Sequence, residues 1–454
     1  MTDVTLVYPY FHPRVDTSIF RFPPLGLGYI ASYLRQNGIS VEIVDCTFLN
    51  QEQALKKIID SNPKIIGIQS MYSMRKKSLE LAKILRGHCK LLVAGGALPT
   101  TEPETFLSDF DVVVIGEGEQ TMLEIANQFK NGGTFSQIKG VAYKDKDIGQ
   151  VKLTSSRGLM DDIDELPPPS RELFENFSYQ KYYDGKFGYK TTAIMTSRGC
   201  PFECDFCSRP IFGNNFRARS ASKVADEVEE AISLGYNRIW FADDCFTLNR
   251  KRLIEVCDEI INRGLRIEWE CLSRVDTLDS ETADKMKQAG CMRMFFGIES
   301  GNDSILKIMN KQITTKQAYI ATQICKKQGI KAGAFFILGY PGENAKTILN
   351  TVKFATSLHL DYLSFTLPYP IPGTPLFERL HGKLVSDEWE EPKNVQMVKH
   401  KLLFDSQVSE LKIKLAVVKG MIQFYIRKYL GERGHRIMNK PIEIVTDAIY
   451  NKMK

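Results

Sequence analysis

The chain has 454 residues, of which 43% are hydrophobic and 25% are charged. This composition excludes a disordered chain and a disulfide-stapled miniprotein. Because no apolar run reaches about 18 residues and the N-terminus lacks a signal-peptide pattern, we expect a cytoplasmic protein without a membrane span. The net charge of +6 is too small to indicate nucleic acid, and we expect no such partner.

Residues 1–130 alternate apolar strands with helical periods. The expected strands are Val4–Tyr8, Val41–Val44, Ile65–Gln69, Leu91–Ala94 and Asp111–Ile115. The expected helices are Leu27–Gln36, Gln51–Ile59, Lys77–Leu85 and Thr121–Phe129. This alternation predicts an α/β domain, a Rossmann-like doubly wound parallel sheet that binds its ligand at the carboxyl ends of the strands.

Residues 131–188 read as a connector. A short hairpin is expected around Val141–Lys152, and Pro167-Pro168-Pro169 follow an acidic stretch. Irregular backbone is predicted for this segment.

A second series of strands and helices fills residues 189–385. Its expected strands are Thr192–Thr196, Arg238–Ala242, Ile267–Leu272, Met292–Ile298, Ala332–Leu338 and Tyr362–Leu367. Its expected helices are Ala221–Leu234, Arg250–Asn262, Ser280–Gln288, Thr315–Lys327 and Ala345–Leu358. Six such units predict a partial (β/α)6 TIM-type barrel with its active residues at the carboxyl ends of the strands.

Residues 386–454 are predicted to form a helical C-terminal region. A stripe at helical spacing comprises Leu411, Leu415, Val418, Ile422, Tyr425 and Tyr429. Residues 401–454 hold 11 Lys and Arg against 5 Asp and Glu, which accounts for the whole positive excess. Such a helix either packs on the barrel or contacts a membrane surface peripherally.

Three of the ten cysteines stand apart from the others, which are scattered singly and expected to be small buried hydrophobes. Cys200, Cys204 and Cys207 follow the first barrel strand at spacings of four and three. Thiolates on one tight loop can hold three corners of a cubane iron–sulfur cluster and leave one iron open. A structural zinc site is the alternative, but it requires a fourth Cys or His, and the next cysteine, Cys245, lies on another strand.

The C-x-x-x-C-x-x-C pattern, with Phe206 before its last cysteine, resembles the radical S-adenosylmethionine (radical SAM) superfamily. The resemblance implies that the three cysteines ligate a 4Fe-4S cluster and that SAM chelates the fourth iron. Reductive cleavage of SAM then gives a 5′-deoxyadenosyl radical. Phe206 is expected near the adenine.

Further matches fall at successive strand ends. Trp240–Thr247 resembles the segment that binds the SAM amino group, with Asp243 and Asp244 as acceptors, and Arg274 is placed to pair the SAM carboxylate. Gly297–Gly301 resembles the segment that contacts the ribose and amino group, which makes Glu299 and Ser300 candidates.

Two later segments complete the resemblance. Phe336–Glu343 resembles the adenine-side strand, where Ile337 lends its backbone, and Pro370–Pro375 resembles a loop after the sixth strand. Taken singly, each candidate side chain could equally be a surface carboxylate, an internally paired arginine or a turn glycine.

The domain ahead of the barrel resembles the cobalamin-binding (class B) branch of this superfamily. The matching stretches are Phe22–Gly28, Gly95–Glu104, Ile115–Glu119 and Leu166–Pro169. Glycines at strand ends let a corrin edge approach the backbone closely, and hydroxyls can bind the nucleotide tail. The candidate cobalamin contacts are Ser70, Gly95, Gly96, Thr100, Thr101, Gly116 and Gly118.

One departure concerns the lower axial ligand. The D-x-H-x-x-G signature of histidine-ligated cobalamin domains is absent, because Asp45-Cys46-Thr47-Phe48 has no histidine at the required position. His12, in the first loop, is an alternative ligand. The domain could also bind another nucleotide or nothing, although the first turn lacks G-x-G-x-x-G.

We therefore predict a cobalamin-dependent radical SAM enzyme that methylates an unactivated carbon of a small-molecule or lipid-like substrate. Ferredoxin or flavodoxin is the expected electron donor, and no catalytic residue is assigned. The alternatives are an oxidative cyclase or carbon–carbon coupling enzyme, similar to the anaerobic magnesium-protoporphyrin monomethyl ester cyclase, a methylthiotransferase, and a non-catalytic metal- or cobalamin-binding module. The pattern identifies neither the substrate nor the oligomeric state.

Overall fold

The computed structural model describes residues 2–11, 19–145, 149–385 and 401–452. Within these ranges the chain divides into two compact units. Unit 1 comprises residues up to 201 together with 209–237, and unit 2 comprises residues 202–208 and those after 237.

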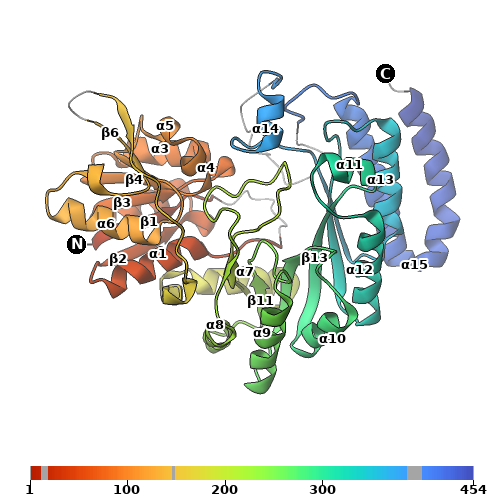
Figure 1. Ribbon diagram of the computed structural model, residues 1–454, viewed down its shortest axis with the longest axis horizontal. Coiled ribbons are helices and arrows are strands. Elements are labelled where there is room, and N and C mark those ends of the chain that lie inside the picture. Colours follow the sequence, from red (N-terminus) through yellow and green to blue (C-terminus); the bar gives the residue numbers. More distant parts are fainter. Residues whose placement is uncertain (1, 12–18, 146–148, 386–400, 453–454) are drawn as a thin grey trace. The chain divides into compact units, whose positions relative to one another are not determined.

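Unit 1 contains a seven-stranded sheet in the order β2-β1-β3-β4-β5-β6-β7 (Figure 1). Its parallel strands are β1 (Thr2–Tyr8), β2 (Val41–Asp45), β3 (Pro63–Gln69), β4 (Leu91–Gly95) and β5 (Val112–Val114). The predicted hairpin is present as antiparallel β6 (Val141–Lys144) and β7 (Val151–Leu153). The strand order reverses between β1 and β3, and open α/β sheets bind ligands at such a switch point.

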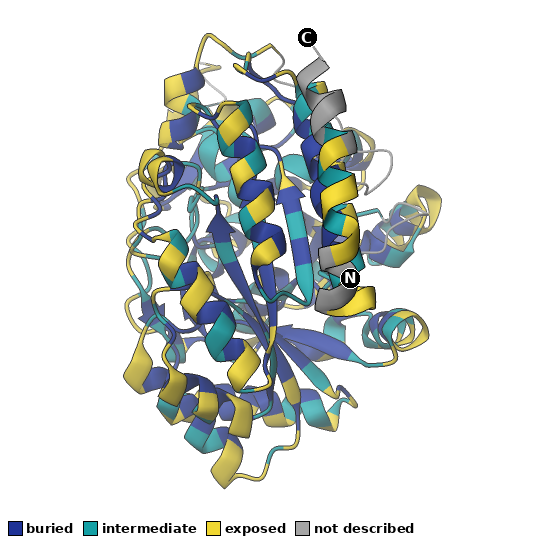
Figure 2. Ribbon diagram, turned by 90° about the vertical axis from the view of Figure 1, so that its right-hand side faces the viewer, coloured by how far each residue is buried: buried dark blue, intermediate teal, exposed yellow. Residues whose placement is uncertain are grey.

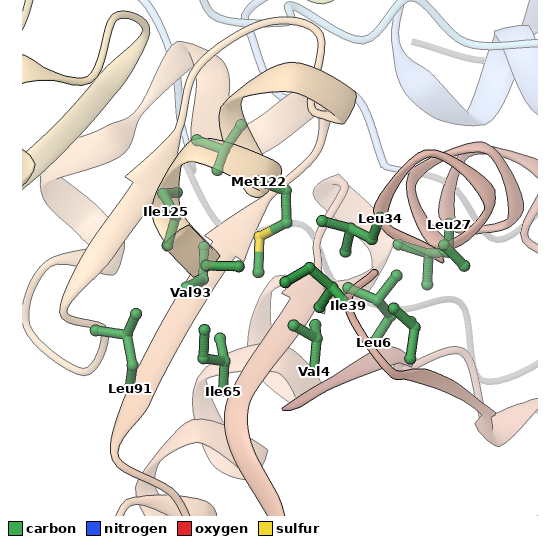
Figure 3. Close-up of a cluster of buried hydrophobic side chains, with 14 of the residues drawn as sticks. Val4, Leu6, Leu27, Leu34, Ile39, Ile65, Leu91, Val93, Met122 and Ile125 are labelled. Atoms are coloured by element: carbon green, nitrogen blue, oxygen red, sulfur yellow. The ribbon is translucent and has the colours of Figure 1, made fainter. Parts of the chain in front are cut away.

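Helices cover both faces of this sheet, as the alternating sequence predicted. One face packs against α1 (Leu25–Gln36) and α6 (Glu119–Lys130), whose Leu34 and Met122 join the strand residues Val4 and Ile65 in a single apolar cluster (Figure 3). The other face packs against the helices α2 (Gln51–Asp60), α3 (Arg75–Leu85), α4 (Ala97–Thr101) and α5 (Pro103–Phe106). The Rossmann-like, doubly wound fold is confirmed.

The prediction of irregular backbone was wrong for the end of the connector. Residues Asn176–Phe187 form helix α7, which ends at Gly188 with φ +74°. The buried hydroxyl of Tyr179 donates to Asp45 Oδ2 (2.6 Å), and that of Tyr183 donates to the Arg21 carbonyl (2.7 Å). Hydrogen-bonded tyrosines, rather than an apolar period of 3.6 residues, therefore anchor this helix.

The remainder of unit 1 carries the start of the second strand series. It comprises β8 (Thr191–Ile194), β9 (Ser197–Arg198), β10 (Arg217–Ala218) and α8 (Ala221–Ser233). On α8 the buried Glu227 pairs with Arg171 and with Arg219, which lies 2.9 Å away, so a buried negative charge is neutralised from two sides.

Unit 2 is built on parallel strands in the order β11-β12-β13-β14-β15. These strands are β11 (Arg238–Phe241), β12 (Glu268–Ser273), β13 (Cys291–Glu299), β14 (Lys331–Ile337) and β15 (Tyr362–Thr366). The helices between and after them are α9 (Arg250–Asn262), α10 (Ser280–Gln288), α11 (Asp303–Ile308), α12 (Thr315–Lys327), α13 (Ala345–Ser357) and α14 (Pro375–Leu380). Buried strands lie behind helices with exposed outer faces (Figure 2). Together with β8 and α8 of unit 1, these elements make up the six predicted β/α units.

The C-terminal region contains α15 (Glu410–Lys452), which bends at Gly431, where φ is +67°. The predicted apolar stripe is not its buried face: Val418, Ile422 and Tyr425 are exposed, whereas Ile413 and Gly420 are buried. This packed face is apolar, with Ile413, Val417 and Phe424 buried, and it needs a small residue at position 420, because a Cβ there would lie 2.8 Å from the Phe365 ring. None of the described helices has both the length and the apolar character needed to cross a bilayer.

Candidate functional site

The first predicted cluster ligand, Cys200, lies in unit 1 directly after β9. Gly199 makes the turn with φ +83°, and a Cβ there would come within 2.2 Å of the Asn215 carbonyl oxygen. The Cys200 amide donates to the Gly213 carbonyl (3.4 Å), and its own carbonyl accepts from Arg209 Nη1 (2.5 Å). The turn before this thiol is thus possible only for glycine.

The other two thiols belong to unit 2. Cys204 is buried and Cys207 is exposed, and the Cys207 amide donates to the Cys204 carbonyl at 3.1 Å. In the described part of the chain no three Cys, His, Asp or Glu side chains lie together as a ready metal site, and no cysteine forms a disulfide. The assignment of Cys200, Cys204 and Cys207 as cluster ligands stays a prediction.

Among the described single cysteines, most are buried small hydrophobes, as expected. Cys89 is the partly exposed one.

Arg274 follows β12 and is buried beside the cysteine loop. Its guanidinium lies 3.5 Å from the centroid of the Phe202 ring and forms two hydrogen bonds of 2.9 Å with Asp276. It also donates to the Lys311 carbonyl (3.0 Å). A carboxylate ligand for Arg274 would therefore share the guanidinium with Asp276.

Glu299 ends β13 in a left-handed conformation, with φ +68°, where the register with β14 shifts. Its buried carboxylate accepts from Lys311 Nζ at 3.1 Å, and this Nζ lies 5.8 Å from the Phe206 ring centroid. Burial alone would lower the pKa of Lys311, but the charges of Glu299 and Cys204 outweigh it and raise that pKa. The sequence did not single out Lys311, since no short motif marks it.

The remaining predicted SAM contacts fall at the same edge of the sheet, because they follow parallel strands. Asp243 is buried and Asp244 is exposed just after β11, and Ile337 is the buried last residue of β14. The Ser300 hydroxyl lies 3.2 Å from that of Thr351 on α13, so it supports the loop after β13.

Glu343 is a further buried group at this edge that the sequence reasoning did not assign. Its Oε2 accepts from the amides of Gly339 (2.7 Å) and Tyr340 (3.0 Å), while Oε1 has no partner among the described residues. Burial raises the pKa of Glu343 to about 7. Only its place in the Phe336–Glu343 segment pointed toward it.

In unit 1 the predicted cobalamin contacts Ser70 and Gly96 meet next to the switch point of the sheet. The Ser70 hydroxyl is fully buried, and neither it nor Gln69 Oε1 has a partner in the described ranges. Gly96 has φ +112°, and a Cβ there would lie 2.5 Å from the Ser70 carbonyl oxygen. Gly95 is less constrained, since its Cβ would lie 3.7 Å from Val114.

The other candidates of unit 1 have visible structural roles. The Thr100 hydroxyl donates to the Gly96 carbonyl (2.8 Å) and accepts from the Gly116 amide (3.1 Å). Thr101 donates to the Leu98 carbonyl (3.1 Å), and a Cβ at Gly118 would lie 2.9 Å from Ile30.

The glutamates of Ile115–Glu119 are buried in ion pairs. Glu117 lies 2.9 Å from both Arg198 and Arg217, and Glu119 lies 2.5 Å from Arg198. Together Glu117, Glu119, Arg198 and Arg217 form an ion-pair quartet. They attach the loop after β5 to the strand that leads into Cys200.

Asp45, at the end of β2, stands where the axial-ligand signature would begin. Its carboxylate accepts from the Thr47 amide (2.9 Å) and hydroxyl (2.6 Å) and from the Tyr179 hydroxyl. Burial raises the pKa of Asp45. His12, the other candidate axial ligand, lies outside the described residues.

Comparison with known proteins matches both parts of the chain. Residues 194–355 match the radical SAM superfamily model, and residues 12–126 match the B12 binding domain model. An uncharacterized methyltransferase of Pyrococcus horikoshii is 36% identical over 421 residues, covering 89% of this chain and 88% of the relative. The anaerobic magnesium-protoporphyrin IX monomethyl ester cyclase of Rubrivivax gelatinosus is 29% identical, covering 86% and 72%.

Among solved structures, the radical SAM methyltransferase TsrM from Kitasatospora setae, with tryptophan substrate and a SAM analogue bound, has the same fold. Its TM-score is 0.73 at 20% identity, covering 89% of this chain and 81% of TsrM. The Pyrococcus relative spans both matched regions. The chain therefore belongs to the cobalamin-binding branch of the radical SAM enzymes.

Proposed function

We propose that this enzyme transfers a methyl group to an unactivated carbon of a small-molecule or lipid-like substrate. In this proposal the first domain holds cobalamin, and Cys200, Cys204 and Cys207 hold a 4Fe-4S cluster that binds SAM. The observation that carries it is the combination, in one chain, of a cysteine triplet after the first barrel strand with a glycine-lined sheet edge. At that edge the Ser70 hydroxyl is buried and has no partner among the residues that the structure describes.

The edge of the first sheet fits a large cofactor that approaches the backbone. Gly96 leaves no room for a Cβ, and the Ser70 hydroxyl and Gln69 Oε1 are buried polar atoms for which a ligand can provide hydrogen bonds. Thr47 stands where the signature of histidine-ligated domains has its histidine, and both Asp45 and Thr47 accept hydrogen bonds from the Tyr179 hydroxyl. We therefore propose that cobalamin binds here without a protein ligand from this segment.

The edge of the second sheet fits a zwitterion. Carboxylates of Asp243, Asp244 and Glu299 are suited to an ammonium group, and Arg274 and Lys311 to a carboxylate. When bound, the cofactors supply the radical and the methyl group. The task of this chain is to orient them through these charges and to exclude water with the apolar residues around Ile337.

Oxidative cyclisation or carbon–carbon coupling is the second candidate. It is favoured by the cyclase relative, which is less similar, at 29% identity, than the methyltransferase relative at 36%. A methylthiotransferase is disfavoured because the N-terminal domain has only Cys46 and Cys89 and lacks the extra cluster cysteines. Product mass separates the first two reactions, because only methylation adds a CH2 unit.

The test is anaerobic purification with cobalamin supplied, followed by an optical spectrum and by counts of iron, sulfide and cobalt. About four irons and one cobalt per chain, with 5′-deoxyadenosine formed from SAM under reduction, are the expected result. Iron without cobalt would exclude methylcobalamin as the methyl donor. Cobalt or zinc without iron would reject the radical SAM reaction and would favour a non-catalytic metal- or cobalamin-binding module. Reduced ferredoxin or flavodoxin, the electron donors we propose in a cytoplasmic setting, should replace the chemical reductant.

A peripheral contact between α15 and an anionic membrane is a separate proposal. It is supported by the exposed side chains of Val418, Ile422 and Tyr429 beside the exposed Lys428, since this combination suits a lipid interface. Flotation with phosphatidylserine vesicles should capture the protein, and the variant Ile422→Glu should reduce capture. Equal recovery with and without vesicles would reject this contact.

A further inference from the structure

Asp205 lies between Cys204 and Phe206, in the loop of residues 202–208 that supplies two of the three proposed cluster ligands. It is buried, with 7% of its surface exposed, although it carries a carboxylate. A buried carboxylate is costly unless it is paired and hydrogen-bonded. The contacts that offset the cost of burying the Asp205 carboxylate therefore indicate the role of this residue.

The carboxylate of Asp205 is paired from two separate elements. The Tyr340 hydroxyl, just after β14, donates to Oδ1, and Arg379 Nη2, on α14, lies 2.8 Å from Oδ2. Arg379 also donates to the Tyr340 hydroxyl (3.3 Å), which closes a triangle of three polar side chains. The Phe206 and Tyr340 rings pack edge to face, with 6.3 Å between their centroids.

The backbone of Asp205 is held as well. Its amide donates to the Met309 carbonyl (3.0 Å), and its carbonyl accepts from the Leu376 amide (2.9 Å). Beside it, the Asn310 side chain donates to the Glu203 carbonyl (2.7 Å). Asp205 therefore joins the cysteine loop to the segments after α11, β14 and β15 through both backbone and side chain.

Stability alone is a poor explanation for this arrangement. The Arg379 side chain is 42% exposed, and ion pairs with a solvent-exposed partner contribute little net stability. Around metal sites, by contrast, hydrogen-bonded partners fix the orientation of the ligands, and their removal weakens metal binding by roughly 10–100-fold. The place of Asp205, next to Cys204 and two residues before Cys207, matches this second use.

We propose that Asp205, with Tyr340 and Arg379, is a positioning residue that presents Cys204 and Cys207 to the iron–sulfur cluster. Arg379 also balances the negative charge of Asp205 beside the anionic thiolates. Helix α14 therefore fixes the position of the cysteine loop through Arg379 and the Leu376 amide. This inference rests on the proposed function, because it assumes that the two thiols ligate iron.

The first measurement uses the metal-free protein. Hydrogen exchange at the amides of Asp205 and Leu376, and the rate at which iodoacetamide alkylates Cys207, are compared between the wild type and Asp205→Asn. The control is Asp361→Asn, since Asp361 accepts from the Ala332 amide (3.0 Å) at the start of β14, the opposite end of that strand. We expect exchange and alkylation to rise several-fold in Asp205→Asn but not in the control.

The second measurement uses the reconstituted holoenzyme. Iron per chain, the rate of iron loss to a chelator, and the EPR spectrum of the reduced cluster with and without SAM are recorded. In Asp205→Asn we expect iron loss to be roughly tenfold faster. Tyr340→Phe keeps the ring contact and Arg379→Lys keeps the charge, so both should show smaller changes in the same direction, even if Asp205→Asn folds poorly.

The outcomes separate the two proposals. A wild-type protein that takes up no iron overturns the proposed function and this inference together. Iron in the wild type, with unchanged exchange, chelation and EPR spectra in Asp205→Asn, Tyr340→Phe and Arg379→Lys, overturns the positioning role alone.

Discussion

The carboxyl edges of the two parallel sheets differ in their chemistry. In unit 1 the edge around Gly95 and Gly96 offers backbone and the buried Ser70 hydroxyl. In unit 2 the corresponding edge carries Asp243, Arg274 and the Glu299–Lys311 pair. We propose that the first edge receives a large cofactor through backbone and a hydroxyl, whereas the second receives a small ionic ligand through charged side chains.

The two edges also obtain their unusual backbone differently. At the first edge, Gly96 takes a positive φ without strain, because it has no Cβ. At the second, a glutamate takes φ +68°, which costs about 1–3 kcal/mol and persists only when its surroundings enforce it. Here the register between β13 and β14 shifts, and the Glu299 carboxylate accepts from Lys311 Nζ at 3.1 Å.

The variant Cys204→Ala should have the largest effect, and it should affect iron binding but not cobalt binding. We expect iron to fall from about four per chain to near zero and SAM cleavage to stop, because the cluster loses a corner. Cobalt should stay at the wild-type level, because Cys204 lies in unit 2 and the predicted cobalamin contacts lie in unit 1. Loss of both metals in a folded protein would show that the two sites depend on each other.

The variant Lys311→Met tests the charged edge. It leaves the Glu299 carboxylate buried without its partner, and breaking such a pair costs about 3–5 kcal/mol. Chemical denaturation should register this loss. The double variant Lys311→Met/Glu299→Gln should recover most of the stability but not SAM cleavage. Equal denaturation midpoints for the wild type and Lys311→Met would contradict the importance of this pair.

The variant Gly96→Ala tests the neutral edge. A methyl group 2.5 Å from the Ser70 carbonyl oxygen, at φ +112°, must displace backbone, so cobalt binding should weaken at least tenfold while iron is retained. Gly95→Ala is the matched control, because its Cβ would meet only Val114 at 3.7 Å. Similar cobalt contents for the two variants would argue against a ligand that approaches this turn.

A smaller effect is expected from Glu343. Because burial raises its pKa to about 7, the folded state favours the neutral carboxyl. Its contribution to stability is complete below pH about 4.5, the ordinary value, and is lost as the pH rises through 7. Glu343→Gln stays neutral, so its melting temperature relative to the wild type should increase between pH 5 and pH 8, by the equivalent of about 1–3 kcal/mol. If the difference in melting temperature did not change with pH, Glu343 would not be the group whose titration lowers the stability.

Local patterns predicted the elements of both sheets, because strands buried on both faces read as apolar runs and helices show their period directly. They also led to the cysteines and to Ser70. The buried roles of Asp205 and Tyr179 could not be predicted, because their partners, Tyr340 and Asp45, lie far along the chain. Lys311 lies only 12 residues from Glu299 but carries no motif that marks it. The buried face of α15 was missed because two neighbouring stripes of this helix are apolar, and the stripe with Ile413, Val417 and Phe424 is the buried one. The space beside Phe365, which requires Gly420, is not visible in the sequence.

The ion-pair quartet has a consequence for the exchange of modules between related enzymes. Glu117 and Glu119 lie in the first domain, whereas Arg198 and Arg217 are the paired residues of β9 and β10, the strands before and after the cysteine segment. A chimera that replaced residues 1–130 with a foreign domain would bury two arginines without counter-charges unless the donor brought its own acidic pair. The first domain and the approach to Cys200 are thus expected to be inherited and engineered as one piece.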